Sequence, residues 1–503
     1  MVELSQDPER GSWANPVEFV LSCIGYAVGI GNVWRFPYLV YRNGGGAFLV
    51  PFIIMLITMG LPIFFLELAI GQYSGLGPNE AFTRMAPAFQ GLGYSTLVVI
   101  MLVMIYYMVI VAWSLFYTFA SFFPKLLWAY CDNDFNTNSK YRTKQSYSYS
   151  FDYVLGLRGA TWENFGGIRW ELLGCLTLAW VICFLCLMRG VQSIGKVVYF
   201  TALFPYVMLT ALLIRGVTLV GAGKGSAWFI KPNWSTLGDA KVWADAASQV
   251  FYSLGIGCGS LITLSSYSNF SNNYAIFVTI TNLLTSIFAG FVIFSILGFL
   301  AHEMQMEIHE VVQSGAGLAF IAYPEAVARM LWPNVWAVLF FIMLFILGLG
   351  SQVSVQAINT AILDLRPDLR KHESYVVLGI CVTCWLLAIP MVFDGGIYLF
   401  TLMDWNTASW AILLIGVAEV GVASWCYGCN KFLRNIAEMQ MRFGCLLHNY
   451  WWFSWVVLAP ITCLVSALRS QTPKRPCLNA IPCPLSDLWR TGRETMPKLF
   501  ADN

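Results

Sequence analysis

Charge is scarce in this sequence. Asp, Glu, Lys and Arg make up 11% of its 503 residues, whereas an average soluble domain carries about 25%. The formal net charge is +2, and no extended run of one sign occurs. The low charge excludes the soluble enzyme folds, and the small net charge gives no basis for nucleic acid as a partner. A small or zwitterionic partner fits this composition better.

Histidine is rarer still, and no catalytic or metal-binding pattern accompanies it. The four histidines are scattered among loops and helix ends, at His302, His309, His372 and His448. A metalloenzyme would need histidine, cysteine or carboxylate ligands at regular spacing. The sequence therefore predicts a protein that is not an enzyme.

Cysteine is plentiful but mostly confined to apolar runs. Three pairs among the fourteen cysteines have the spacing of zinc or redox sites: Cys183 with Cys186, Cys381 with Cys384, and Cys426 with Cys429. No histidine pair accompanies them, and two of the pairs lie in predicted membrane helices. We interpret these cysteines as small packing residues.

Long apolar runs dominate what is present. Hydrophobic residues make up 58% of the chain, and the mean hydropathy is +0.65. A lipid core of about 30 Å is crossed by about 20 helical residues. Eleven runs are long enough: 16–38, 45–70, 94–122, 168–188, 196–220, 241–268, 274–300, 334–362, 375–392, 396–424 and 447–467. The sequence predicts an all-α integral membrane protein in a lipid bilayer.

The connectors predict how the chain is organised. Lys and Arg gather in connectors that share one side of the membrane if residues 1–15 are cytoplasmic. On that topology residues 125–167 form a large outer loop, and residues 217–240 and 301–333 are outer loops too. After the eleventh span at 447–467, residues 468–503 are polar and rich in proline, so an expected twelfth span is not recognisable.

Two of the spans contain glycine clusters in their middle. The strings are GYAVGIG at residues 25–31 and GIGCG at 255–259. An unwound backbone in lipid must be buried in protein or line a wet cavity, because each unpaired amide costs several kcal/mol. The two breaks open successive five-span groups, 16–220 and 241–424. This pattern indicates an inverted five-helix repeat, a ten-helix transport core with a midplane site. Close helix packing through small residues is the alternative.

Five strings are specific enough to indicate a family. They are IGYAVGIGNVWRFPY at 24–38, NGGGAF at 43–48, ELAIGQY at 67–73, GKVVYF at 195–200 and GLGSQ at 348–352. Together they resemble the neurotransmitter:sodium symporters of solute carrier family 6, over about residues 10–465. Two further strings, at 246–254 and 317–325, are most similar to its glycine and proline transporter branch. The resemblance implies a plasma-membrane protein that takes up its substrate with sodium by alternating access.

The resemblance also implies sets of binding residues. The substrate would contact Ala27, Gly29, Ile30, Gly31, Tyr107, Tyr252, Ser253, Gly255 and Cys258. One sodium ion would be held by the substrate carboxylate with Ala27, Asn32, Ser253 and Asn282. A second would be held by Gly25, Val28, Leu347 and Ser351. Chloride would be bound by Gln249, Ser253, Asn282 and Ser286. Taken singly, each polar side chain here could equally form an ordinary interhelical hydrogen bond.

Four positions depart from the patterns of relatives. Gly29 stands where monoamine transporters resembling this chain carry Asp, so the substrate should bring its own carboxylate. Cys258 stands where glycine transporters carry Trp, which enlarges the pocket toward alanine, proline or longer neutral side chains. Gly350 removes one side chain from the second sodium site. Phe52 replaces the usual Tyr, which removes a hydroxyl and should weaken chloride dependence.

The resemblance implies two gates and a function. The outer gate would pair Arg35 with Asp404, under the aromatic lid Tyr252. The inner gate would set Arg10 and Trp13 against Asp364, although Arg10 could be a plain positive-inside residue. The predicted function is sodium-coupled symport of small neutral amino acids, glycine first, with one copy of the chain sufficient. The alternatives are proline, alanine or a broader range, and a non-transporting, receptor-like member of the family.

Overall fold

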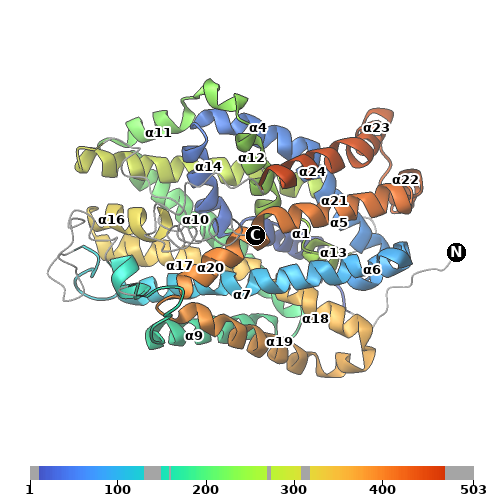
Figure 1. The fold of residues 1–503 in the computed structure, drawn as a ribbon, viewed down its shortest axis with the longest axis horizontal. Helices are drawn as coiled ribbons and strands as arrows, with labels where there is room; N and C mark the ends of the chain where they lie inside the picture. Colours follow the sequence, from blue (N-terminus) through green and yellow to red (C-terminus); the bar gives the residue numbers. More distant parts are fainter. Residues whose placement is uncertain (1–10, 130–148, 158–159, 269–273, 307–317, 471–503) are drawn as a thin grey trace, which may run out of the picture.

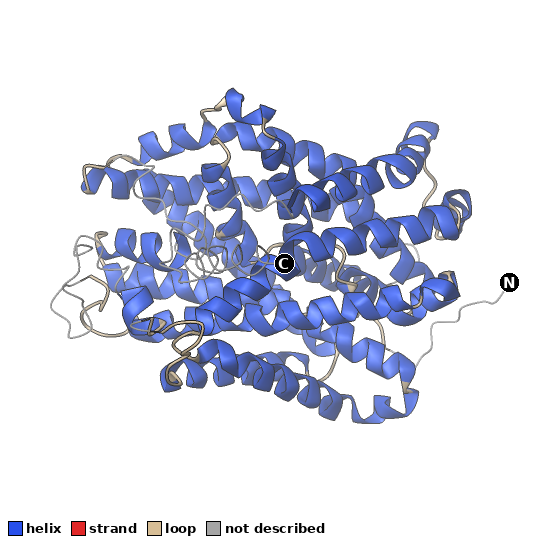
Figure 2. Ribbon diagram, in the orientation of Figure 1, coloured by secondary structure: helices blue, strands red, loops and turns tan. Residues whose placement is uncertain are grey.

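The protein is almost entirely helical. In the computed structural model the described residues are 11–129, 149–157, 160–268, 274–306 and 318–470. Figure 2 shows helices throughout these ranges and no strand, apart from two isolated bridges that the ribbon does not draw. Helices are expected because a backbone surrounded by lipid must satisfy its own amides. The described ranges contain eight helices long and apolar enough to cross a membrane, or up to ten with two bent pairs counted as one span each.

The helices follow the predicted spans closely. Within residues 16–220 they are α1 (Pro16–Ala27), α2 (Ile30–Val33), α3 (Arg35–Arg42), η2 (Gly46–Phe48), α4 (Leu49–Met55), η3 (Leu56–Gly60), α5 (Leu61–Ser74), α6 (Pro78–Met85), η4 (Pro87–Phe89), α7 (Gly91–Ala120), η5 (Tyr149–Val154), α9 (Trp170–Leu187) and α10 (Val191–Val217). The longest, α7, packs against α9 and against a helix from the second half of the chain, α17 (Pro333–Ser351).

The second half of the chain is also built from long and short helices. Its elements are α12 (Ala240–Leu254), α13 (Ser260–Ser266), α14 (Ala275–Glu303), α17, α18 (Ser354–Leu365), η8 (Pro367–His372), α19 (Glu373–Ala388), η9 (Ile389–Val392), α20 (Gly396–Asn406), η10 (Thr407–Ala411), α21 (Ile412–Gly421) and η11 (Val422–Cys426). Figure 1 shows these helices, coloured from green through yellow to orange, among the helices of the first half, and α13 packs against α5 while α17 packs against α7. The two halves therefore build one bundle rather than two separate domains.

Both predicted breaks are present. In the first span, α1 ends at Ala27 and α2 begins at Ile30, and the two parts of the span are bent by 50°. In the sixth span, α12 ends at Leu254 and α13 begins at Ser260. The sixth span is the reason why ten spans are recognised where the sequence predicts eleven, because both of its halves are short and the break between them, residues 255–259, is longer than the break in the first span.

Two connectors contain helices that the sequence did not predict. The expected outer loop 217–240 holds α11 (Ala222–Ile230) and η6 (Trp234–Gly238), and α11 packs along α14. The expected loop 301–333 holds η7 (Leu318–Ala322) and α16 (Tyr323–Ala328). These segments are too short to give the signal of a membrane span.

The C-terminal part of the bundle lies at its edge. It consists of α22 (Cys429–Glu438), α23 (Cys445–Phe453), η12 (Ser454–Leu458) and α24 (Ala459–Ser470). The last three form the predicted eleventh span, which packs against α12 and α21. The tail beyond residue 470, residues 130–148 and 158–159 of the loop 125–167, and Arg10 fall outside the described residues.

Candidate substrate and ion site

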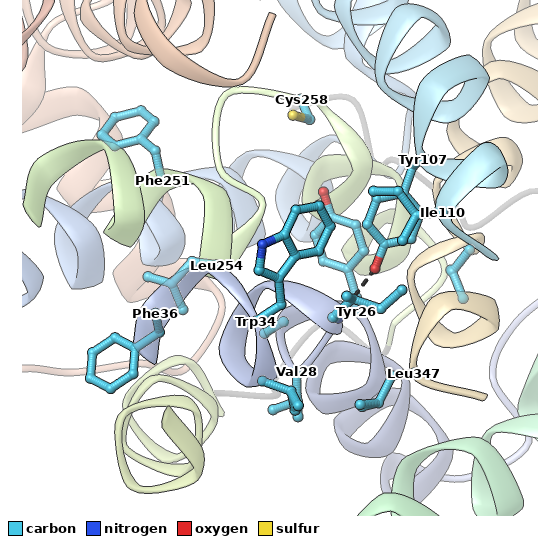
Figure 3. Packing of buried hydrophobic residues seen from close by; sticks show 14 of the residues in the cluster. Tyr26, Val28, Trp34, Phe36, Tyr107, Ile110, Phe251, Leu254, Cys258 and Leu347 are labelled. Carbon is cyan, nitrogen blue, oxygen red and sulfur yellow. Dashed lines mark hydrogen bonds between the residues drawn. The ribbon is translucent and has the colours of Figure 1, made fainter. Parts of the chain in front are cut away.

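A small cavity lies where the two broken spans meet. Its volume is about 60 Å³. It is lined by Tyr26, Ala27, Gly29, Gly31, Asn32, Ile100, Val103, Met104, Tyr107, Phe251, Tyr252, Ser253, Gly255, Cys258, Ser351, Ser354 and Ile412. All the predicted substrate residues except Ile30 are in this set, and Ile30 contacts one of its members. Figure 3 shows Tyr26, Tyr107 and Cys258 around this region.

Tyr107 closes the gap left by the first break. Its hydroxyl accepts a hydrogen bond from the Ile30 backbone amide at 3.3 Å and lies 3.1 Å from the Ser351 hydroxyl. In Figure 3 the Tyr107 ring reaches from α7 toward the ribbon of the first span. An amide at the start of a helix has no acceptor within the helix. The break therefore presents a donor and two hydroxyls to a ligand in the cavity.

Glycine is required at Gly29 by close neighbours. A Cβ atom there would lie 2.7 Å from the Ser351 hydroxyl oxygen and 3.1 Å from the Tyr107 hydroxyl oxygen. An aspartate at this position would thus displace the two hydroxyl groups. The structure gives a steric reason, beside the charge argument, for the absence of an acid at Gly29.

Asn32, Ser253 and Asn282 form a buried polar cluster from three spans. The Asn32 amide nitrogen donates to the Asn282 side-chain oxygen at 2.7 Å. The Ser253 hydroxyl donates to the Asn32 side-chain oxygen at 3.0 Å, and the Asn282 amide nitrogen donates to the Ser253 oxygen at 2.9 Å. Oxygen atoms are the ligands that hard cations prefer. The cluster brings together the three side chains predicted for the first sodium ion, beside the cavity-lining residue Ala27.

The residues predicted for the second sodium ion are arranged less favourably. Gly350 packs on the Gly25 carbonyl so closely that a Cβ atom would lie 2.8 Å from its oxygen. The hydroxyl of Ser351 faces Tyr107, as described above. Val28 follows the end of α1 and its backbone is no longer helical, with φ −96° and ψ 83°. Leu347 is buried on α17. This second ion site stays a prediction.

The predicted chloride residues continue the polar cluster. The Gln249 amide nitrogen donates to the Gly31 carbonyl at 3.4 Å, while its side-chain oxygen is buried without a hydrogen-bond partner. The Ser286 hydroxyl donates to the Asn282 carbonyl at 3.0 Å. Phe52, which lacks the hydroxyl expected there, is fully buried with its ring centroid 5.0 Å from that of Phe36.

Tyr252 and Arg35 cover the cavity on one side. A Cβ atom on Gly31 would lie 2.5 Å from the Tyr252 ring, so the ring rests directly on the backbone of the first break. The Arg35 guanidinium lies 4.4 Å above the same ring and donates to the Ser248 hydroxyl at 3.1 Å. Asp404 is close enough to Arg35 to interact with it electrostatically. The predicted outer-gate residues therefore lie together.

Trp13 packs against the second half of the sixth span. Its indole nitrogen donates to the Leu264 carbonyl at 3.0 Å, and its backbone amide donates to the Tyr267 carbonyl at 3.2 Å. Asp364 accepts from the Gly77 amide at 2.8 Å, and Arg370 lies 4.0 Å from it. The proposed partner of Asp364, Arg10, is outside the described residues, so that pairing stays a prediction.

Two buried carboxyl groups lie beside the second break, and the sequence analysis assigns no role to either. Glu67 accepts a hydrogen bond from the Gly257 amide at 2.7 Å, and Glu419 from α21 is close enough to interact with Glu67 electrostatically. Both side chains are fully buried. Two carboxylates in contact repel, and one shared proton removes the repulsion. An acid in the middle of an apolar span is itself a signal of function, and Glu419 could have been identified from it.

Tyr26 joins the two breaks, a role the sequence did not indicate. Its hydroxyl donates to the Gly255 carbonyl at 2.8 Å. Gly255 has a φ of +65°, and its missing side chain leaves the space that the Tyr26 ring occupies. This glycine therefore accommodates a tyrosine of the first span, in addition to lining the cavity.

Comparison with known proteins gives one family and several close relatives. The family described as the sodium:neurotransmitter symporter family matches residues 10–478. The protein called sodium- and chloride-dependent GABA transporter 2 of Bos taurus is 42% identical over 484 residues, covering 92% of this chain and 80% of the relative. The protein of the same name from Rattus norvegicus matches with the same identity and coverage. These relatives do not specifically support the resemblance to the glycine and proline branch.

Proposed function

This chain belongs to the sodium:neurotransmitter symporter family, and from that premise we propose that it is a sodium-coupled symporter of small neutral amino acids. Its apolar helices and its relatives make it a multi-pass membrane transporter and not an enzyme. We further propose that it acts in the plasma membrane with a cytoplasmic N-terminus, as the distribution of Lys and Arg suggests.

One observation carries the proposal: the polar cluster and the Tyr107 hydroxyl border the same cavity. A substrate carboxylate placed there can accept from the Ile30 amide and the Tyr107 hydroxyl. The same carboxylate can supply an oxygen to a sodium ion held by Asn32 and Asn282. Because the ion and the anion would then complete each other's binding sites, each would bind weakly without the other. This reciprocity is what coupled transport needs.

Two substrates fit the carboxylate requirement. Glycine is the candidate from the sequence, because two strings are similar to glycine transporters. GABA is the second candidate, because the relatives that match most of the chain bear that substrate in their names. The cavity walls formed by Ile100, Val103 and Met104 are apolar, so they contact methylene groups without selecting a second charged group. In proline and alanine, as in glycine, the amine lies on the carbon next to the carboxylate, so GABA is the longest of the candidates between these two groups.

The ion gradients can drive accumulation of such a substrate. A tenfold sodium gradient and a membrane potential of about 60 mV each release about 1.4 kcal/mol per ion. Two ions therefore release about 5 to 6 kcal/mol, which concentrates a neutral substrate more than a thousandfold. Chloride entering with them would offset part of the charge, and we propose a weaker chloride dependence than in relatives because of Phe52.

Radiolabelled uptake into cells tests this function. Glycine, alanine, proline and GABA are each offered in sodium medium and in medium where choline replaces sodium. We expect uptake of at least one of them to require sodium, and the order of uptake to decide between glycine and GABA. Uptake that is the same in choline medium would contradict the mechanism.

Tyr107→Phe tests the site within the same assay. Loss of the hydroxyl removes one of the two donors that we propose for the substrate carboxylate, a change that costs about 1–3 kcal/mol. We expect KM for the substrate to rise by about 5- to 100-fold, since 1.4 kcal/mol is tenfold. The control is Tyr206→Phe, which removes a hydroxyl bonded to Thr285 outside the cavity. Equal KM values for the two variants would count against Tyr107 as a substrate contact.

A further inference from the structure

The outer-gate residue Asp404 lies on a helix that has few neighbours. It is in the last turn of α20, and apart from its chain neighbours η9 and η10 this helix makes extensive contact with only one described element, α7. The Phe400 ring takes part in that contact, with its centroid 5.0 Å from the Trp113 ring and 5.9 Å from the Tyr106 ring. A helix that is held along one side can still pivot. A second anchor is therefore needed to keep Asp404 beside Arg35.

The chain just before α20 pairs with the end of the predicted outer loop. Three backbone hydrogen bonds join the two segments: from the Arg169 amide to the Val392 carbonyl at 3.1 Å, from the Asp394 amide to the Gly167 carbonyl at 3.1 Å, and from the Gly395 amide to the Phe165 carbonyl at 2.9 Å. An antiparallel bridge between Ile168 and Phe393 lies among them. We call these paired segments, residues 165–169 and 392–395, the outer clasp. Its hydrogen bonds are those of a short antiparallel ladder.

The Asp394 side chain reinforces the outer clasp. One carboxylate oxygen accepts a hydrogen bond from the Gly167 amide at 2.9 Å, and the Arg169 Nε lies 4.0 Å from the other oxygen. Glycines leave the space for this carboxylate, because a Cβ atom on Gly166 would lie 2.6 Å from it and one on Gly156 would overlap it. Both glycines have a positive φ, so the loop bends around the carboxylate at positions that suit glycine alone.

The first turn of α20 is attached to the same loop. The Tyr398 hydroxyl donates to the Ala160 carbonyl at 3.3 Å. Asp404 follows six residues later on the same helix, which is about 9 Å at 1.5 Å per residue. A helical segment this short moves as a rigid rod. The position of the outer loop is therefore passed on to Asp404.

We propose that Asp394 is a positioning residue of the outer gate, which holds α20 through the outer clasp so that Asp404 stays beside Arg35. The inference rests on the proposed function, in which the cavity opens and closes. No residue of the outer clasp lines the substrate cavity. Loss of the Asp394 carboxylate should therefore change how often the cavity opens to the outside, and leave the groups that bind substrate in place.

Cys258 provides a reporter of that opening, because it lines the cavity and is only 4% exposed in this closed arrangement. A membrane-impermeant methanethiosulfonate reagent is applied to intact cells in sodium medium without substrate. Labelling of the peptide that contains Cys258 is followed by mass spectrometry over time, on protein recovered from the cell surface by biotinylation. We expect Asp394→Ala to raise the labelling rate by about fivefold or more, since about 1 kcal/mol shifts the equilibrium of the gate that far.

Matched variants separate the outer clasp from other effects. Glu163→Gln removes a charge from an exposed position of the same loop and should leave the labelling rate unchanged. Asp404→Ala breaks the gate itself and should raise the rate. If Asp404→Ala raises it and Asp394→Ala does not, the proposal is wrong. It is equally wrong if neither variant raises the rate, or if Glu163→Gln raises it as much as Asp394→Ala.

A second variant covers the case in which Asp394→Ala does not reach the cell surface. Gly166→Ala places a methyl group against the Asp394 carboxylate and should also raise the labelling rate, and an unchanged rate would contradict the proposal. Labelling does not require transport, so its outcome is independent of the uptake assay. A parent protein that takes up none of the substrates but shows these labelling rates would reject the proposed function and retain the role of Asp394.

Discussion

At two positions of the first break, neighbouring side chains leave no room for a residue larger than glycine. Gly29 faces the hydroxyls of Ser351 and Tyr107, and Gly31 faces the ring of Tyr252. Neither has the positive φ that favours glycine, so the requirement at both comes from neighbouring side chains. At the residue scale, the substrate cavity is shaped as much by absent side chains as by those that line it.

Gly29→Ala should impair transport. The added methyl group would lie 2.7 Å from the Ser351 oxygen, so Ser351 or Tyr107 must move, and the Ile30 amide loses its ordered acceptor. We expect kcat/KM for sodium-driven uptake to fall by about tenfold or more, equivalent to about 1.4 kcal/mol. The matched control is Gly174→Ala on α9, where a methyl group meets no atom within 4 Å. Similar uptake by both variants would contradict this account.

At the scale of single elements, the sequence predicted the breaks but not what stabilises them. Glycine clusters inside apolar runs are a local signal, which is why residues 25–31 and 255–259 could be identified. The Tyr26 contact with Gly255 spans 229 positions and leaves no such signal. The sequence predicts a loop where α11 lies, because this helix is too short to give the signal of a membrane span.

The second break depends on Glu67. Its carboxyl group holds the Gly257 amide, which has no helical partner because the chain is unwound there. Glu67→Gln keeps a side-chain oxygen as acceptor and should retain most uptake and expression. Glu67→Ala leaves a buried amide unsatisfied, at a cost of about 1–3 kcal/mol. We expect at least a fivefold loss of uptake per transporter at the cell surface.

Comparing these two variants distinguishes hydrogen bonding from charge. If Glu67→Gln is as impaired as Glu67→Ala, then the negative charge or the proton shared with Glu419 matters, and the role of a simple acceptor is wrong. Surface biotinylation provides the number of transporters, so that a defect in folding is not counted as a defect in transport.

At the scale of the whole molecule, polar side chains from the two halves of the chain meet in one cluster. Gln249 and Ser286, from α12 and α14, extend the Asn32 cluster toward the predicted chloride position. The sequence predicted these side chains only through the family resemblance, since each alone looks like an interhelical hydrogen bond. The structure brings these side chains together. Uptake measured with sodium or chloride replaced in the medium tests which ion each group binds.

Phe52→Tyr should strengthen chloride dependence. Phe52 is buried against Phe36 on the element that continues from Asn32, and Gln249 has a buried oxygen without a partner. An added hydroxyl supplies one more donor for an anion. We expect replacement of chloride by gluconate to reduce uptake by the variant several-fold more than uptake by the parent.

The control for that change is Phe48→Tyr, because Phe48 stacks on Phe52 with ring centroids 6.2 Å apart in the same aromatic group. It tests whether any new hydroxyl there has the effect. An identical response to gluconate in all three proteins would show that the missing hydroxyl has no influence on chloride.

The same structure contains two contacts at the broken spans. Tyr252 lies under Arg35, and Trp13 is hydrogen-bonded to the Leu264 carbonyl of α13. We expect these two contacts to act as barriers in series, which would leave water and ions no continuous path across the bundle. A cell expressing this protein should therefore show no leak current at rest, and electrical recordings should detect current only when substrate is supplied.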